Sequence, residues 1–193
     1  MNNGTLLTNG FDRAKILRNL FTEVTAMLII AKSLRELSFG QLMQVYEEGN
    51  FENGAQLWPD APPGQQLAMA EQEFYAYLQQ VFFRTPGAVY CIWEQDHAYV
   101  SALRLEPYRD GLLLEALETA PDKRRQGHAR RLMQETTAWL KEKGGGILYS
   151  HVGKRNTASL GVHGQLGFER VSELAVYADG SVNDYCCTLK LSI

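Results

Sequence analysis

The stretch LLLEALETAPDKRRQGHARR, residues 112–131, joins an apolar strand-like segment to a basic glycine turn and the start of an amphipathic helix. A tight turn before a helix aims several unpaired backbone N–H groups at one point, and the positive end of the helix dipole favours an anion there. The cationic side chains around Gly127 are those of Lys123, Arg124, Arg125, Arg130 and Arg131. This pattern predicts a site for the pyrophosphate of a nucleotide-like ligand.

The composition fits one globular domain. The chain has 193 residues, of which 45% are hydrophobic and 21% charged, enough for a sizeable core. Its formal net charge is −3, whereas nucleic-acid-binding domains usually carry a broad basic excess. We therefore expect no nucleic-acid partner, and the basic cluster at 123–131 fits a small polyanionic ligand better.

The cysteines and the apolar runs indicate in which cellular compartment we expect the protein. Cys91, Cys186 and Cys187 show no metal-type spacing, so we expect no metal site and a reducing, cytoplasmic location. No apolar run approaches the ~20 residues of a membrane span. The run from Ala26 to Ala31 is too short for a secretory signal, so we expect no membrane partner.

Hydrophobic periodicity predicts a mixed α+β chain in which residues 1–26 are set apart from a domain over residues 27–193. Residues 1–26 are either an upstream extension or a genuine N-terminal helix beginning after Asp12. The elements expected after it are a strand at 28–30, helices at 38–49 and 65–83 with a linker at 50–64, strands at 89–93, 99–105 and 112–119, a helix ending near 143, a strand at 147–151, a helix at 156–166, and strands at 168–177 and 185–191.

This order of elements resembles the GNAT superfamily of N-acetyltransferases. The run Arg124-Arg125-Gln126-Gly127-His128-Ala129 is similar to the family's coenzyme A turn. The run Asn156-Thr157-Ala158-Ser159, followed by His163 and then Gly167-Phe168, is similar to its second motif. The resemblance covers about residues 27–193 and implies a mixed α+β sheet, splayed at its centre and flanked by helices.

The resemblance also implies where acetyl-CoA binds as co-substrate. The backbone of Leu117 to Thr119 would pair with the pantetheine arm, the backbone of Gln126 to Arg130 would hold the pyrophosphate, and Asn156 would contact the arm from the other side. Arg124 and Arg125 would hold phosphate oxygens with forked donors. The implied coenzyme contacts are Leu117, Thr119, Arg124, Arg125, Gln126, Gly127, His128, Ala129, Arg130, Asn156 and Ser159.

Acetyl transfer to an amine needs a base that removes the ammonium proton. Glu115 is the first choice, because many members of the family carry a glutamate in the strand before the turn, and Glu118 is the second. Under strict alternation the two side chains face opposite sides of the strand, although a bulge would change that. The alternative is that each carboxylate is solvated or paired with an arginine.

His163 occupies the position where the family usually has a tyrosine that acts as acid. An imidazolium can donate a proton, with an unperturbed pKa of about 6.5. The alternative is that His163 fills space or bonds a backbone carbonyl.

The function expected from the resemblance is acetyl-CoA-dependent N-acetyl transfer to an amine of a small molecule, peptide or protein. The alternative is a non-catalytic acyl-CoA-binding, regulatory domain. A dinucleotide-binding domain fits less well, because no Gly-x-Gly-x-x-Gly follows the first strand. Glu52 and Asp60, in a segment that shapes the acceptor site in this family, suit a cationic amine. Exposed edges of a mixed sheet would permit a homodimer.

Overall fold

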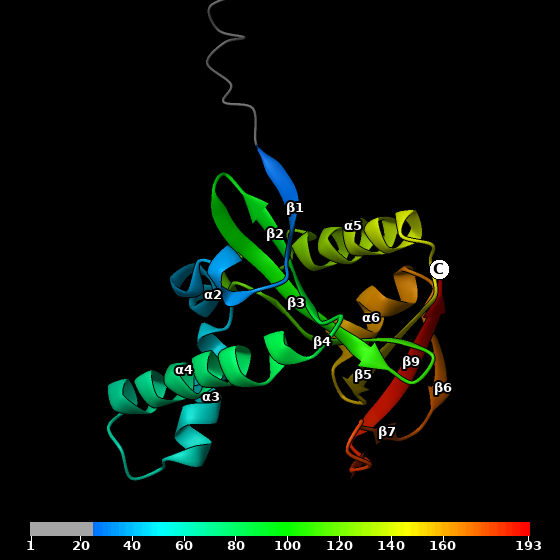
Figure 1. Ribbon diagram of the computed structural model, residues 1–193. Helices are drawn as coiled ribbons and strands as arrows, with labels where there is room; N and C mark the ends of the chain where they lie inside the picture. Colours follow the sequence, from blue (N-terminus) through cyan, green and yellow to red (C-terminus); the bar gives the residue numbers. More distant parts are fainter. Residues whose placement is uncertain (1–24) are drawn as a thin grey trace, which may run out of the picture.

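The computed structural model describes residues 25–193, which form a mixed sheet with helices on both faces (Figure 1). The predicted helix after Asp12 lies outside the described residues. The sheet order is β1-β2-β3-β4-β5-β9-β6. Its strands are β1 (Ala26–Ala31), β2 (Val89–Gln95), β3 (Ala98–Tyr108), β4 (Gly111–Thr119), β5 (Ile147–Gly153), β6 (Glu169–Ser172) and β9 (Cys186–Ser192). A separate ribbon pairs β7 (Ala175–Val176) with β8 (Val182–Asn183).

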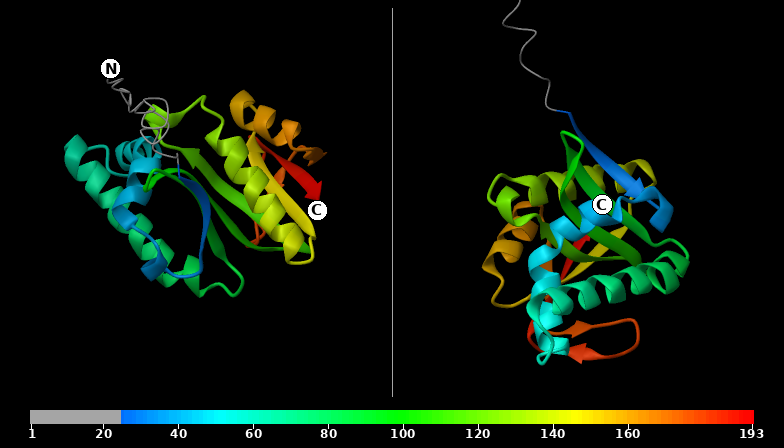
Figure 2. Two further views of the ribbon diagram at one scale, coloured as in Figure 1. Left: turned by 90° about the horizontal axis from the view of Figure 1, so that it is seen from above. Right: turned by 90° about the vertical axis from the view of Figure 1, so that its left-hand side faces the viewer.

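The helices lie in two layers, one on each face of the sheet (Figure 2). The first layer contains η1 (Leu34–Glu36), α2 (Phe39–Val45), α3 (Glu47–Leu57), α4 (Pro63–Gln80) and η2 (Phe82–Arg84). The second contains α5 (His128–Glu142) and α6 (Thr157–Gln165), and η3 (Pro121–Lys123) leads into α5. None of the helices in residues 25–193 is long and apolar enough to cross a membrane.

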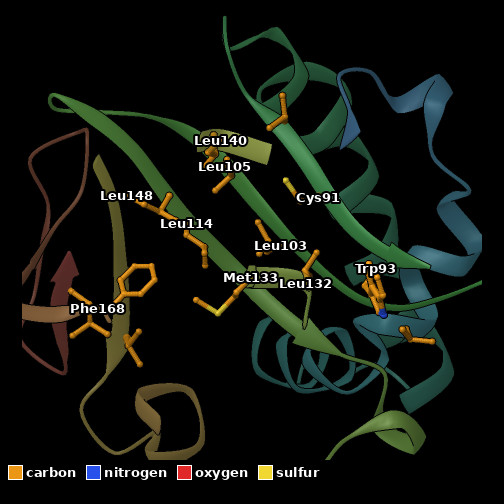
Figure 3. Close-up of a cluster of buried hydrophobic side chains, with 14 of the residues drawn as sticks. Cys91, Trp93, Leu103, Leu105, Leu114, Leu132, Met133, Leu140, Leu148 and Phe168 are labelled. Atoms are coloured by element: carbon orange, nitrogen blue, oxygen red, sulfur yellow. The ribbon is translucent and has the colours of Figure 1, made fainter. Parts of the chain in front are cut away.

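Two hydrophobic clusters hold these layers to the sheet. Cys91 and Leu103 pack with Leu132 and other residues of α5 on one face (Figure 3). Tyr90, the neighbour of Cys91 in β2, packs with Leu42 and other residues of α2 and α4 on the opposite face. Successive side chains of a strand point to opposite faces, so β2 and β3 are buried on both sides and fix the position of β4 beside them.

Strand β4 departs from regular pairing at both of its edges. Its register with β3 pairs Arg104 with Glu115 and then shifts, to resume with Ala102 opposite Glu118. Ala116, inside this bulge, has a φ of +50°. On the other edge, the parallel pairing with β5 covers only residues 112–114 of β4 and 148–150 of β5. The two strands therefore separate after Leu114 and Ser150, which leaves backbone edges open between them.

The predicted linker at residues 50–64 was wrong, because α3 occupies most of it. The sequence predicts that a helix ends near Gly49, whereas both Gly49 and Gly54 lie inside α3. A Cβ at Gly54 would lie 2.5 Å from the carbonyl oxygen of Gln66 in α4, so this glycine serves the close approach of two helices. The strand expected over 168–177 was also too long, because β6 ends at Ser172 and the chain turns before β7.

Candidate functional site

A cavity of about 680 Å³ lies where β4 separates from β5 and where α5 and α6 begin. Every residue that the sequence predicts to contact acetyl-CoA lines it, except Gln126. The lining residues are Leu117, Glu118 and Thr119 of β4, then Arg124, Arg125, Gly127, His128, Ala129 and Arg130, and Asn156, Ala158, Ser159, Val162 and Gln165 of the α6 region. The side-chain amide of Gln126 instead donates to the carbonyl of Asp122 (3.2 Å).

The glycine turn exposes the start of α5 to this cavity. Arg125 and Gly127 have φ values of +59° and +86°, both in the left-handed region. Gly127 is the N-cap residue, and no side chain caps the first turn of α5. The first N–H groups of the helix therefore face the cavity without a capping acceptor, which is the arrangement that binds phosphate groups. A Cβ at Gly127 would meet no atom within 4 Å, so the positive φ is what requires glycine there.

Arg124 ties the turn to the carboxylates of neighbouring elements. Its guanidinium pairs with Glu48 of α3 and lies 3.8 Å from the Glu118 carboxylate, and its Nε donates to the carbonyl of Thr119 (3.3 Å). Within residues 25–193, Arg125 and Arg130 form no ion pair. These two arginines, rather than Arg124, have guanidinium groups free for a phosphate.

The α6 motif caps its own helix. The Asn156 side-chain oxygen accepts the N–H of Ser159 (2.9 Å) and so satisfies a donor of the first turn. This contact orients the Asn156 side chain at the cavity wall.

His163 is not among the residues that line the cavity, and it is almost fully buried, at 1% exposure. Its Nδ1 donates to the carbonyl of Ser159 (2.8 Å), because a carbonyl can only accept, and its Nε2 accepts from the hydroxyl of Ser150 (2.9 Å). Burial lowers the pKa of His163 and favours the neutral ring. These contacts support the alternative for His163: a structural histidine that links α6 to β5.

The bulge in β4 brings Glu115 and Glu118 to the same face of the sheet. Glu115 lies opposite Arg104, and Glu118 lies opposite Ala102. Because residues 102 and 104 are two apart on β3, their side chains share a face, and so do their partners on β4. Both carboxylates thus face the layer of α2, α3 and α4, whereas Leu117 packs with the opposite cluster.

Glu115 has the chemistry of a base that works near neutral pH. Burial raises the pKa of Glu115 to about 7, and a hydrogen bond with the Glu106 carboxyl acts in the same direction. The guanidinium of Arg104, 3.7 Å away, opposes this rise. That guanidinium lies 5.0 Å from the ring centre of Tyr77 and is held against it. Burial also raises the pKa of Glu118, and Arg124 is the cation that opposes it.

Sequence reasoning missed Arg104 and Glu106 as parts of this site. These two residues interrupt an apolar strand at alternate positions, a signal that points to one polar face of β3. His151 follows Ser150 where β5 leaves β4, and its ring stands edge-on to Tyr108 and Tyr177, with centroids 5.4 and 4.9 Å away. It does not line the cavity.

Known proteins resemble this chain in sequence and in fold. The profile of the acetyltransferase (GNAT) family matches residues 51–168. An aminoglycoside N(6')-acetyltransferase type 1 from Salmonella typhimurium is 29% identical over 125 residues, which cover 63% of this chain and 84% of that protein.

Two solved structures share the fold. The PaiA N-acetyltransferase from Thermoplasma acidophilum, in complex with coenzyme A, has 13% identity and a TM-score of 0.58, over 86% of this chain and 99% of that one. The ribosomal-protein-S18-alanine N-acetyltransferase from Escherichia coli has 18% identity and a TM-score of 0.56, over 86% and 94% of the chains.

Proposed function

Because this chain belongs to the GNAT family of acetyltransferases, we propose that it transfers the acetyl group of acetyl-CoA directly to a primary amine, with both substrates bound together. The observation that carries the proposal is the cavity between β4 and the starts of α5 and α6. Strand β4 forms one wall of this cavity and bears Glu115 on its opposite face. Holding two substrates in attack geometry supplies much of the acceleration of such a reaction.

The coenzyme half of the site is assigned from the cavity lining. The uncapped N–H groups at the start of α5 hold the pyrophosphate, with Arg125 and Arg130 as its cationic partners. The open edge of β4 from Leu117 to Thr119 pairs with the pantetheine arm as an added strand would. We assign Arg124 to positioning Glu118 and Glu48, because its guanidinium already contacts both carboxylates.

The chemical step is assigned to Glu115 and to the backbone of the bulge. Glu115 accepts the proton of the bound ammonium, and a pKa of about 7 suits this role at neutral pH. The amine then attacks the thioester carbonyl, and the backbone N–H of Leu117 donates to the oxygen on which negative charge develops. The C–S bond breaks, the sulfur leaves as thiolate, and the thiolate takes the proton that the nitrogen loses as the amide forms, which gives the free thiol of coenzyme A. We assign no role in this step to His163, since both of its nitrogens are engaged within the protein.

The acceptor half favours a cationic amine. Glu115 and Glu118 share a face with Glu106, and the charges of Glu48 and Glu52 act on Glu118 and raise its pKa further. Clustered carboxylates of this kind attract and retain polycations. The aminoglycoside acetyltransferase among the relatives acts on such a compound, so we favour a small molecule with several amines over a peptide terminus.

The test begins with coenzyme binding. Isothermal titration of the full chain with acetyl-CoA should give saturable binding, and NAD, as the control, should give none. Absence of acetyl-CoA binding at millimolar ligand overturns the proposal. Release of thiol is then followed with an aminoglycoside (kanamycin), a polyamine (spermidine) and an alanine-terminated peptide. Binding of acetyl-CoA without turnover of any amine supports the non-catalytic alternative.

The base is tested by Glu115→Gln, with Glu118→Gln as the matched variant on the same face. Loss of general base catalysis lowers turnover by about 10²- to 10⁴-fold. We expect that loss at neutral pH for Glu115→Gln only, with little change in the affinity for acetyl-CoA. The reverse result would assign the base to Glu118.

A further inference from the structure

The bulge of β4 holds a non-glycine residue in an unfavourable backbone conformation. Ala116 has a φ of +50°, a left-handed conformation that is unfavourable for a residue that carries a Cβ. The pairing of β3 with β4 passes over both Ala116 and Leu117, so the sheet itself does not fix the peptide between them. Such a conformation persists only where its surroundings stabilise it.

Tyr46 supplies that stabilisation from the other layer of the molecule. Its hydroxyl donates to the Ala116 carbonyl oxygen at 2.6 Å. The phenol ring is buried at the junction of α2 and α3. It packs against Phe74 and stands edge-on to Tyr90, with ring centroids 5.5 and 6.4 Å away. Burial raises the pKa of Tyr46, so the hydroxyl keeps its proton at neutral pH and remains a donor there.

This contact fixes the direction of the next N–H group. Every described peptide bond is trans, and in a planar trans peptide the C=O and the following N–H point in opposite directions. The Ala116 carbonyl points to Tyr46, in the layer of α2 and α4. The Leu117 N–H is therefore directed to the opposite face, where Leu117 lines the cavity.

We propose that Tyr46 is a positioning residue that holds the Ala116–Leu117 peptide so that the Leu117 N–H points at the thioester carbonyl oxygen in the cavity. The proposal rests on the proposed function, since it concerns the donor that stabilises the oxyanion. Tyr46 touches neither substrate and acts through the peptide alone. The proposal thus gives a role in catalysis to Tyr46, which belongs to the layer of α2, α3 and α4 on the face of the sheet opposite the cavity.

The test replaces Tyr46 by phenylalanine, which keeps the ring and its packing and removes only the hydroxyl. Removal of one oxyanion donor costs about 10²- to 10³-fold in kcat, so Tyr46→Phe should lose at least 10-fold in kcat, with an affinity for acetyl-CoA within about twofold of wild type. Tyr99→Phe is the matched control. It removes a buried tyrosine hydroxyl of the same cluster that bonds the N–H of Ser38 and does not touch the bulge.

Two spectroscopic measurements need no amine acceptor. With acetyl-CoA labelled with ¹³C at the carbonyl, the infrared C=O stretch of the bound thioester should lie below that of free acetyl-CoA in wild type and in Tyr99→Phe. In Tyr46→Phe it should return toward the free value. The Leu117 amide, labelled with ¹⁵N, should shift on acetyl-CoA binding in the first two proteins and much less in Tyr46→Phe.

The outcomes separate the two proposals. If wild type does not bind acetyl-CoA, the proposed function fails. If wild type binds it but Tyr46→Phe, shown to be folded by its melting curve, gives the wild-type carbonyl stretch, the proposed function stands and the role of Tyr46 is refuted. Equal effects of Tyr46→Phe and Tyr99→Phe would also refute it, because they would report loosening of the cluster as a whole.

Discussion

Arg104→Met should move the pH dependence of catalysis to higher pH. Arg104 is the cation that favours the charged form of Glu115, with 3.7 Å between guanidinium nitrogen and carboxylate oxygen. Methionine retains an unbranched apolar stem against Tyr77 and Phe82, where the guanidinium now lies. The substitution therefore removes the charge and keeps most of the packing.

The size of the effect follows from the ion pair. At this separation two unit charges attract by about 4 kcal/mol at an effective dielectric constant of 20, equivalent to about 3 pKa units at most. The side chains of Arg104 and Glu115 are 15% and 20% exposed, so solvent screens part of this, and an opposite charge in such surroundings typically shifts a pKa by about 1–3 units. We expect a rise of about 1–2 units in the pKa of Glu115 above its value of about 7.

The direction of the change in the pKa of Glu115 determines what the assay should show. A base must be deprotonated to act, so a higher pKa leaves fewer active molecules at neutral pH. In Arg104→Met, kcat/KM at pH 7 should fall by about 5- to 50-fold for that pKa rise. The rate should recover as the pH rises through the new pKa. Titration of ¹³C-labelled glutamate carboxyl groups by NMR measures the same pKa directly and needs no acceptor.

The matched control is Arg124→Met, which removes the cation beside Glu118. If Glu115 is the base, the ascending limb of the rate profile moves in Arg104→Met and stays in place in Arg124→Met. A limb that moves only in Arg124→Met assigns the base to Glu118. A limb that moves to lower pH in Arg104→Met refutes the electrostatic reasoning itself.

Substitutions at three further positions test other parts of the structure. Gly127→Asp should abolish acetyl-CoA binding in isothermal titration, because it adds a carboxylate at the predicted pyrophosphate site. Gly127→Ala is the control: it should still bind acetyl-CoA, and its free energy of unfolding should fall by only the roughly 1 kcal/mol that a φ of +86° costs alanine. His163→Phe should lower the free energy of unfolding by about 1–3 kcal/mol, because Ser150 and the Ser159 carbonyl lose their partner. The pH profile of kcat should stay unchanged, and loss of one limb of that profile would support the acid role of His163. Gly54→Ala should lower the melting temperature, because its Cβ would lie 2.5 Å from the Gln66 carbonyl oxygen; an unchanged melting curve would contradict the close helix packing.

The sequence predicts the fold because its signals are local. The alternation in residues 89–105 marks the two strands predicted there, and β2 and β3 lie at these positions, joined by a turn at Asp96 and His97, which both have a positive φ. The turn at Gly127 and the helix after it also lie where the pattern predicts them. Local signals failed over residues 50–64, where a linker was predicted and α3 lies, and Gly54 in that helix is required by the close approach of α4.

The site is less accessible from sequence because its chemistry depends on contacts between distant residues. The position of Glu115 is readable, but its raised pKa comes from burial and from Glu106 on the neighbouring strand. Strict alternation would have put Glu115 and Glu118 on opposite faces, and the positive φ of Ala116 that reverses this is not encoded by any glycine. His163 matches the motif position, yet its hydrogen bonds to Ser159 and Ser150, which favour a structural role, cannot be read from the motif.

The bulge also has a consequence for how this enzyme can change over time. Within four residues, β4 turns the side chains of Glu115 and Glu118 toward the layer of α2, α3 and α4, and, as we propose, the Leu117 N–H toward the cavity on the other face; a single extra residue sets these directions. Substitutions in this segment alter one contact at a time. Loss or gain of one residue would move every side chain beyond it to the other face of the sheet and turn a carboxylate toward the cavity. We therefore expect functional descendants of this gene to vary in the composition of residues 115–118 while keeping their number fixed.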